Sequence, residues 1–70
     1  MYVYKFGKDK NILLDGRSII FLSKELKYNR EHLSLILKGE RHCTYELAKR
    51  IVNRLKPNGK VEDYFIKEED

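Results

Sequence analysis

The stretch that decides the fold runs from Ser18 to Arg41 and reads SIIFLSKELKYNREHLSLILKGER. Its first half places residues of one helix face at the spacing i, i+3, i+4 and i+7: Ile19, Leu22, Ser23 and Leu26. Ser18 is the first candidate for the N-cap of this helix, and Asp15 is the second. The spacing therefore predicts a helix that begins after Ser18 and ends before Lys27.

A second helix is predicted directly after this one. Lys27-Tyr28-Asn29 interrupts the first helical pattern, and Asn29 is a good N-cap for the second helix. Glu31 falls in the first turn, where the helix dipole favours an acidic side chain. The buried stripe of the second helix consists of Leu33, Ile36 and Leu37. Gly39 is placed to end it.

A third helix is predicted from Thr44. One face carries apolar residues at helical spacing: Leu47, Ala48, Ile51 and Leu55. The basic residues Lys49, Arg50 and Arg54 lie largely off this face, which is typical of a hydrated helix surface. Pro57-Asn58-Gly59 ends the helix.

The segments on either side of the helices are short. The β-prone runs Tyr2–Phe6 and Ile12–Leu14 flank a polar connection, which predicts a β-hairpin closed by the turn Asp15-Gly16. Val61 with Tyr64-Phe65-Ile66 fits either a helical turn or a strand that pairs with the amino-terminal segment. The acidic end is expected to extend into water as a short tail.

Length and charge limit the class of protein. Seventy residues allow one small domain, divided into segments 1–16, 17–56 and 57–70. The net charge is +4, but residues 17–60 alone hold eleven Lys and Arg against four Glu. Because this basic excess coincides with the predicted helices, it favours a polyanion as partner, although charge runs are also common on ordinary hydrated faces.

Several classes of function are not expected. The longest apolar runs are far shorter than the roughly 20 residues of a membrane span, and the start lacks the pattern of a secretory signal. The one cysteine, Cys43, cannot form an internal disulfide. We expect no metal site, no cofactor, no small-molecule substrate and no enzymatic activity, because the sequence contains no ligand cluster, nucleophile–base pair or phosphate loop. A cytoplasmic location is expected.

Residues 18–41 resemble the helix-turn-helix of the Cro/CI-type (XRE-like, lambda-repressor-like) phage regulators. The matching positions are Leu22, Leu26, Tyr28, Leu33, Ile36 and Gly39, with Ser23 at the small position where the two helices approach. The resemblance covers roughly residues 17–56. It implies a mainly α fold, namely a compact helix-turn-helix DNA-binding domain of three or four short helices, here with an amino-terminal β-hairpin.

Three features depart from this family. Lys27 stands where the turn commonly has Gly, and a left-handed conformation there would cost Lys about 1 kcal/mol relative to Gly. The usual first helix is missing from the prediction. Ile20 and Phe21 occupy normally polar positions, and we expect the hairpin to cover them; the alternative is that they form part of a dimer surface.

The resemblance implies that helix 29–38 reads the major groove of DNA. Arg30 is a candidate to pair with guanine, Glu31 to accept from cytosine, and Leu35 to contact a thymine methyl. Alternatives remain open: Arg30 as a solvated or phosphate-bound residue, Glu31 as a helix-dipole partner and Leu35 as part of the core. The full candidate set for base contacts is Arg30, Glu31, His32, Ser34 and Leu35, although His32 also fits an ordinary surface histidine.

The phosphate backbone is expected to contact residues at the ends of the two motif helices. Ser18 and the amides around Ile19 open a helix whose N-terminus can hold a phosphate, with Arg17 beside it. Cations just past the recognition helix are placed to reach the flanking strand. The candidate set is Arg17, Ser18, Asn29, Lys38, Arg41 and His42.

The function expected from this pattern is sequence-specific transcriptional regulation by a Cro-like or repressor-like protein of a phage or mobile element. Its partner is a double-stranded DNA operator with inverted half-sites, bound by a homodimer at the nucleoid of a bacterial or phage-infected host. The dimer surface is either the edge of Tyr2–Phe6 or the cluster at Tyr64-Phe65-Ile66. The alternative function is a helix-turn-helix scaffold that sequesters a repressor or another protein and depends on apolar residues such as Phe65.

Overall fold

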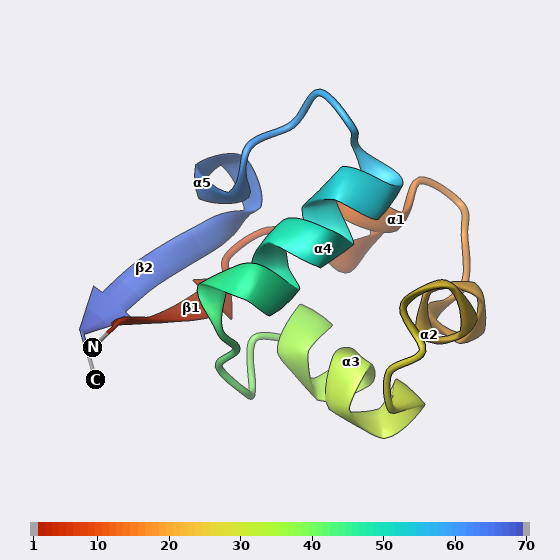
Figure 1. The fold of residues 1–70 in the computed structure, drawn as a ribbon, viewed down its shortest axis with the longest axis horizontal. Coiled ribbons are helices and arrows are strands. Elements are labelled where there is room, and N and C mark those ends of the chain that lie inside the picture. Colours follow the sequence, from red (N-terminus) through yellow and green to blue (C-terminus); the bar gives the residue numbers. More distant parts are fainter. Residues whose placement is uncertain (1, 70) are drawn as a thin grey trace.

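Residues 2–69 are described by the computed structural model of the protein, and they form five helices and two strands. The elements in chain order are β1 (Tyr2–Phe6), α1 (Lys10–Leu14), α2 (Ile19–Leu26), α3 (Arg30–Leu37), α4 (Tyr45–Leu55), α5 (Val61–Tyr64) and β2 (Phe65–Glu69). Helices make up about half of the chain, which confirms the mainly α class. Figure 1 shows α4 between the two-stranded sheet on one side and α2 on the other.

The predicted amino-terminal hairpin is wrong in its second half. Tyr2–Phe6 is a strand as expected, but Ile12–Leu14 belongs to the helix α1. The side chain of Asp9 starts this helix by accepting a hydrogen bond of 2.8 Å from the backbone N–H of Asn11. The helix buries both Leu13 and Leu14, whereas neighbouring residues of a strand point to opposite faces. Together α1 and α5 raise the number of helices above the three or four expected.

The strand β1 finds its partner at the other end of the chain. It pairs antiparallel with β2, so that Tyr2 lies opposite Glu69 and Phe6 opposite Phe65. On its other edge, Tyr4 exchanges two backbone hydrogen bonds of 2.8 Å with Cys43. At Tyr4, therefore, β1 lies between two neighbouring segments.

The acidic carboxy-terminal segment is folded, so the expected tail in water is wrong for the residues up to Glu69. Val61–Tyr64 forms the helical turn α5, and Phe65 then begins β2, so both alternatives left open for this segment occur in succession. Phe65 is buried, with its ring centroid 5.3 Å from that of Phe6 in an edge-to-face arrangement. Through this contact β2 packs against the core, while its acidic side chains Glu68 and Glu69 remain exposed to water. Asp70 lies outside the described residues.

The core contains the apolar faces predicted from helical spacing, together with Val52 of α4, which the predicted face did not include. Buried residues from the three longer helices are Leu22, Leu26, Leu33, Ile36, Leu37, Leu47, Ala48, Ile51, Val52 and Leu55. They are joined by Leu13 and Leu14 of α1 and by the aromatic pair of the sheet. None of the buried side chains among the described residues is polar or charged. Burial of this apolar surface is the main favourable contribution to folding.

The predicted helix ends are confirmed by their capping geometry. The side chains of Ser18 and Asn29 accept hydrogen bonds of 3.0 and 3.1 Å from the backbone N–H groups of Phe21 and His32. Gly39 ends α3 with a φ of +78°, a conformation that L-residues with a Cβ rarely adopt. These caps set the lengths and the entry angles of α2 and α3.

Lys27 ends α2 in the left-handed conformation, with φ 53° and ψ 48°. Lys27→Gly is expected to raise the free energy of unfolding by about 0.5–1 kcal/mol, because glycine adopts this conformation without steric cost. A gain of about 1 kcal/mol corresponds to an increase in Tm of roughly 4–8 °C for a domain of this size, measurable by circular dichroism. The matched control is Lys24→Gly in the last turn of α2, where the backbone is helical, and it should destabilise the protein by up to about 1 kcal/mol. A lower Tm for Lys27→Gly would contradict the prediction.

Candidate nucleic-acid interface

Helices α2 and α3 form a tight pair joined by Lys27-Tyr28-Asn29. The backbone N–H of Tyr28 donates to the carbonyl of Ser23 at 3.1 Å, which holds the start of the turn against the end of α2. Leu33 and Ile36 of α3 are almost completely buried, while the opposite face of this helix is exposed. In Figure 1, α3 lies at the lower edge of the molecule, away from β2.

The predicted base-contacting residues fall into two groups. Arg30, Glu31 and Leu35 are exposed and share the outward face of α3. Ser34 lies on the same face and is half-buried. His32 is also half-buried and lies on the flank, where its ring is 6.2 Å from that of Tyr28. The structure therefore groups four of the five residues on one surface and sets His32 apart from them.

Leu35 is 36% exposed, and it is one of the few large apolar side chains at the surface of the described chain. The alternative in which Leu35 extends the core stripe of α3 does not hold. Its partners in the helix, Leu33, Ile36 and Leu37, occupy the core face, and Leu35 points away from them. A ligand at the outward face of α3 would therefore meet a leucine.

The predicted phosphate-contacting residues lie at the helix ends as expected, but they differ in availability. The oxygens of Ser18 and Asn29 already accept backbone N–H groups, so these residues would act by shaping the helix N-termini. Among residues 2–69, Arg17, Lys38 and Arg41 are exposed and have no ion-pair partner. Of the predicted phosphate contacts, these three cations are the ones most available to a polyanion.

His42 is already engaged within the protein. Its Nε2 lies 2.6 Å from Oε1 of Glu68 in β2, and both side chains are about half exposed. A phosphate contact by His42 would require this pair to open. The sequence contained no signal for the pair, since the two residues are far apart in the chain.

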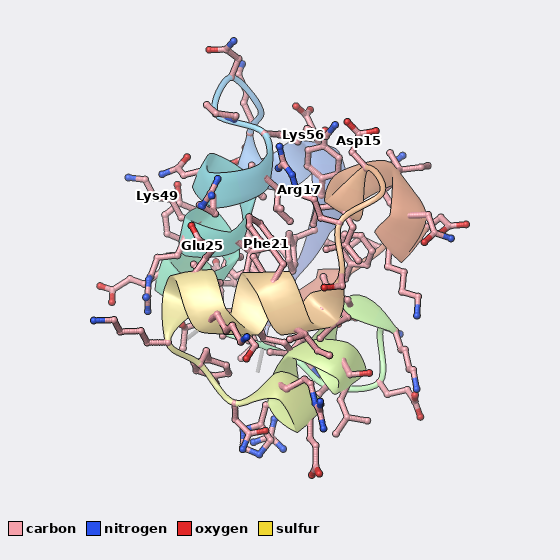
Figure 2. The ribbon with its side chains drawn as sticks, turned by 90° about the vertical axis from the view of Figure 1, so that its right-hand side faces the viewer. Asp15, Arg17, Phe21, Glu25, Lys49 and Lys56 are labelled. Atoms are coloured by element: carbon pink, nitrogen blue, oxygen red, sulfur yellow. The ribbon has the colours of Figure 1, made fainter. Side chains whose placement is uncertain are left out.

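The expected amino-terminal hairpin does not form, so it does not cover Ile20 and Phe21. Its strand β1 pairs with β2 and Cys43 and lies on the far side of α4 from α2. Phe21 is half-buried and packs against the core, with the guanidinium groups of Arg17 and Arg54 at 5.8 and 5.1 Å from its ring centroid. Figure 2 shows Phe21 of α2 facing α4, near the side chains of Arg17 and Glu25. Ile20 remains 47% exposed.

Two arginines of α4 hold α2 in place rather than forming a purely hydrated face. Arg50 donates from Nη2 to the carbonyl of Leu26 at 2.7 Å, which satisfies a backbone group at the end of α2. Arg54 donates from Nε to Oε1 of Glu25 at 2.6 Å. Lys49 is exposed, as expected for a hydrated face. Of the basic residues of α4, therefore, two contribute to the fold and are less available to an external anion.

A hollow of about 440 Å³ lies between α2 and the first turn of α3. It is lined by Ile20, Ser23, Lys24, Asn29, Arg30 and Glu31. Sequence reasoning missed Lys24 and Ile20 as residues of this surface. Their separation of four residues places them on one face of α2, so helical spacing could have linked them. The hollow joins the exposed side of α2 to the predicted reading face of α3.

A second hollow, of about 400 Å³, lies near the start of α4. It is lined by Tyr28, Arg41, His42, Cys43, Thr44, Glu46, Leu47 and Arg50. Cys43, which lines this hollow, is the one cysteine of the protein and is buried. Burial raises the pKa of its thiol to about 11. The thiol therefore stays protonated, and a poor nucleophile, at neutral pH.

The protonated state of Cys43 predicts slow chemical modification. Because its pKa lies near 11 in the folded protein, alkylation by iodoacetamide at about pH 8 should be slower by at least a factor of about ten than in the unfolded chain. Mass spectrometry with and without guanidinium chloride measures the two rates. The difference should narrow as the pH approaches 11, where the thiolate becomes populated. Equal rates at about pH 8 would show that the thiol is accessible and unperturbed.

Within residues 2–69, no three side chains of His, Cys, Asp or Glu are gathered so that they could hold a metal ion. None of the helices described has the length and apolar character that crossing a membrane requires.

No protein-family model, curated protein or solved structure matches this chain.

Proposed function

We propose that the protein is a sequence-specific regulator that binds double-stranded DNA, similar to the Cro-like and repressor-like proteins of phages and mobile elements. In this proposal α2 and α3 act as a helix-turn-helix, and α3 enters the major groove. Its activity is binding and not catalysis, and it would act in the cytoplasm at the nucleoid. The proposal rests on the residues that α3 exposes and on the cations around it.

The observation that carries the proposal is the two-sided character of α3. Its inner face is buried through Leu33, Ile36 and Leu37, so its orientation relative to α2 is determined by packing. Its outer face presents Arg30 and Glu31 at the N-terminal turn, where a recognition helix contacts base edges. Lys38 and Arg41 lie at its C-terminal end, within reach of a phosphate strand.

Selection from a random duplex pool tests this proposal. At moderate salt the protein should enrich a defined sequence, and Arg30→Ala should relax the preference at one base pair by roughly 5–150-fold. Lys49→Ala, which removes an exposed cation of α4, is the matched control and should leave the selected sequence unchanged. If no sequence is enriched, the proposal fails; if Arg30→Ala leaves the preference intact, the assignment of Arg30 fails alone.

A homodimer is part of the proposal, because inverted half-sites require two copies of the reading helix. Of the two candidate surfaces, the strand Tyr2–Phe6 is engaged on both edges at Tyr4, whereas the outer edge of β2 is open within the described chain. Ile66 of β2 is 54% exposed. We propose the outer edge of β2 as the dimer contact.

The dimer contact at β2 predicts a change in oligomeric state. Ile66→Lys should shift the sedimentation coefficient at micromolar concentration to that of a monomer, because a lysine at this position opposes close pairing of two strands. Ile12→Lys changes an isoleucine of similar exposure on α1 and should leave the dimer intact. A wild-type protein that is monomeric both free and on DNA would contradict the dimer.

The alternative function, sequestration of another protein, loses its expected anchor. Phe65 is only 3% exposed and packs against Phe6, so it is not available to a partner. The dependence of affinity on salt separates the two functions. A complex dominated by apolar contacts should be nearly independent of salt, whereas a complex with DNA should weaken strongly.

A further inference from the structure

Ile20 is a large apolar side chain that the protein leaves uncovered. It is 47% exposed and lines the hollow between α2 and the first turn of α3. Its neighbour Ile19 packs against the core, whereas Ile20 does not. The sheet lies on the other side of α4 from α2, the helix that carries Ile20 (Figure 1). Ile20 is therefore accessible to a ligand that binds at the hollow.

The surroundings of Ile20 indicate what kind of group that is. The other side chains of the hollow are polar or charged: Ser23, Lys24, Asn29, Arg30 and Glu31. Two of these are cations, one is an acid and two are uncharged hydrogen-bonding groups, so the hollow is not an apolar groove for a protein side chain. A ligand that fits must combine negative charge and hydrogen-bonding groups with a small apolar group.

The major groove of DNA offers this combination. Thymine presents its 5-methyl group there, next to the O4 acceptor of the same base and close to the hydrogen-bonding edges of adjacent pairs. Phosphates on the rim of the groove match Lys24 and Arg30 in charge. Glu31 can accept from an exocyclic amine of a neighbouring base. An isoleucine within this polar surface fits the methyl group.

We infer that Ile20 is a specificity-determining residue that contacts the 5-methyl group of a thymine in each half-site. This inference rests on the proposed DNA-binding function. It adds that one thymine of each half-site is recognised by a residue of α2, next to the bases that α3 contacts. Leu35 is a separate candidate for a thymine contact from α3. The two residues lie on different helices, so they address different base positions.

Replacement of thymine by deoxyuridine tests the inference, because it removes only the methyl group. In the sequence enriched by selection, each thymine is replaced singly, and affinity is measured by fluorescence anisotropy. At one position per half-site the wild-type protein should lose affinity by about fourfold, the value expected for one buried methyl group. In Ile20→Ala the same replacement should change affinity by less than about 1.5-fold, since the apolar partner is gone.

Two further variants make the result specific. Ile12→Ala removes an exposed isoleucine from α1 and should keep the full sensitivity to deoxyuridine. Leu35→Ala should keep the sensitivity to deoxyuridine at the position assigned to Ile20. Any loss of sensitivity in this variant should occur at a different thymine. Ile20→Val retains an apolar group and should keep part of the sensitivity, and far-ultraviolet circular dichroism verifies that each variant is folded.

The outcomes separate this inference from the function on which it rests. If no duplex is enriched, the proposed function fails. If a duplex is enriched but Ile20→Ala retains every deoxyuridine sensitivity of the wild type, or if no thymine is sensitive, the inference is overturned and DNA binding stands. If Ile20→Ala changes the sedimentation of the free protein instead, Ile20 belongs to a contact between protein chains, and the inference is overturned as well.

Discussion

Leu33→Ala is expected to lower the free energy of unfolding by about 2–5 kcal/mol, the range for removing a leucine side chain from a packed core. Leu33 has no exposed surface and connects α3 to the core shared with α2 and α4. A domain of this size has a total stability of only about 5 kcal/mol, so at the upper end of this range a large part of the population should unfold at 37 °C. Urea denaturation followed by circular dichroism measures the change.

Leu35→Ala provides the matched comparison within the same helix. The residue type and the substitution are identical, but Leu35 is 36% exposed and lies on the outward face of α3. We expect a change in stability of less than about 1 kcal/mol, with the fold retained. If the two variants were destabilised equally, the orientation of α3 with Leu33 inward and Leu35 outward would be incorrect, and with it the assignment of its reading face.

Affinity for duplex DNA is expected to fall by about 1000-fold when monovalent salt is raised from about 50 to about 200 mM. Arg17, Lys38 and Arg41 are the exposed Lys and Arg residues among the predicted phosphate contacts. In a homodimer they correspond to about six neutralised phosphates, and each contributes about 0.9 to the slope of log affinity against log salt. Titrations at several salt concentrations, followed by fluorescence anisotropy, measure this slope.

Variants assign the slope to individual side chains. Lys38→Gln and Arg41→Gln should each reduce it by about 0.9 per subunit and weaken all duplex sequences alike, because phosphate contacts carry no sequence information. Lys49→Gln should leave the slope unchanged: Lys49 extends from α4, and Figure 2 shows it on the opposite side of α2 from α3. A slope near zero for the wild type would favour a protein partner over DNA.

Glu68→Gln addresses His42, the one histidine among the predicted phosphate contacts, which a carboxylate of the protein already engages. Because the carboxylate of Glu68 lies 2.6 Å from Nε2 of His42, removing its charge frees His42 for a phosphate. We expect a modest gain in affinity for DNA at low salt, of about twofold to threefold, that disappears at high salt. Unchanged affinity would show that His42 takes no part in binding.

Local features of the sequence were sufficient to predict the helical pair and its boundaries. The apolar spacing of Leu22 and Leu26, the side-chain caps at Ser18 and Asn29, and the stop at Gly39 all depend on residues within one or two turns of each other. The left-handed conformation at Lys27 follows from the same local geometry. The outward positions of α3 could also be predicted, since burial of Leu33 and Ile36 leaves the opposite face exposed.

The tertiary structure alone decided what the flanking segments do. Ile12–Leu14 has the residues of a strand, but it folds as a helix because α1 can bury two adjacent leucines, and β1 pairs with β2 from the other end of the chain. Such choices depend on contacts between residues that are distant in sequence, which local propensity does not encode. The same holds for the surface. Arg54 is held by Glu25 and Phe21 while Ile20 is left exposed, because the packing of α4 on α2 determines which side chains are covered and which remain available to a partner.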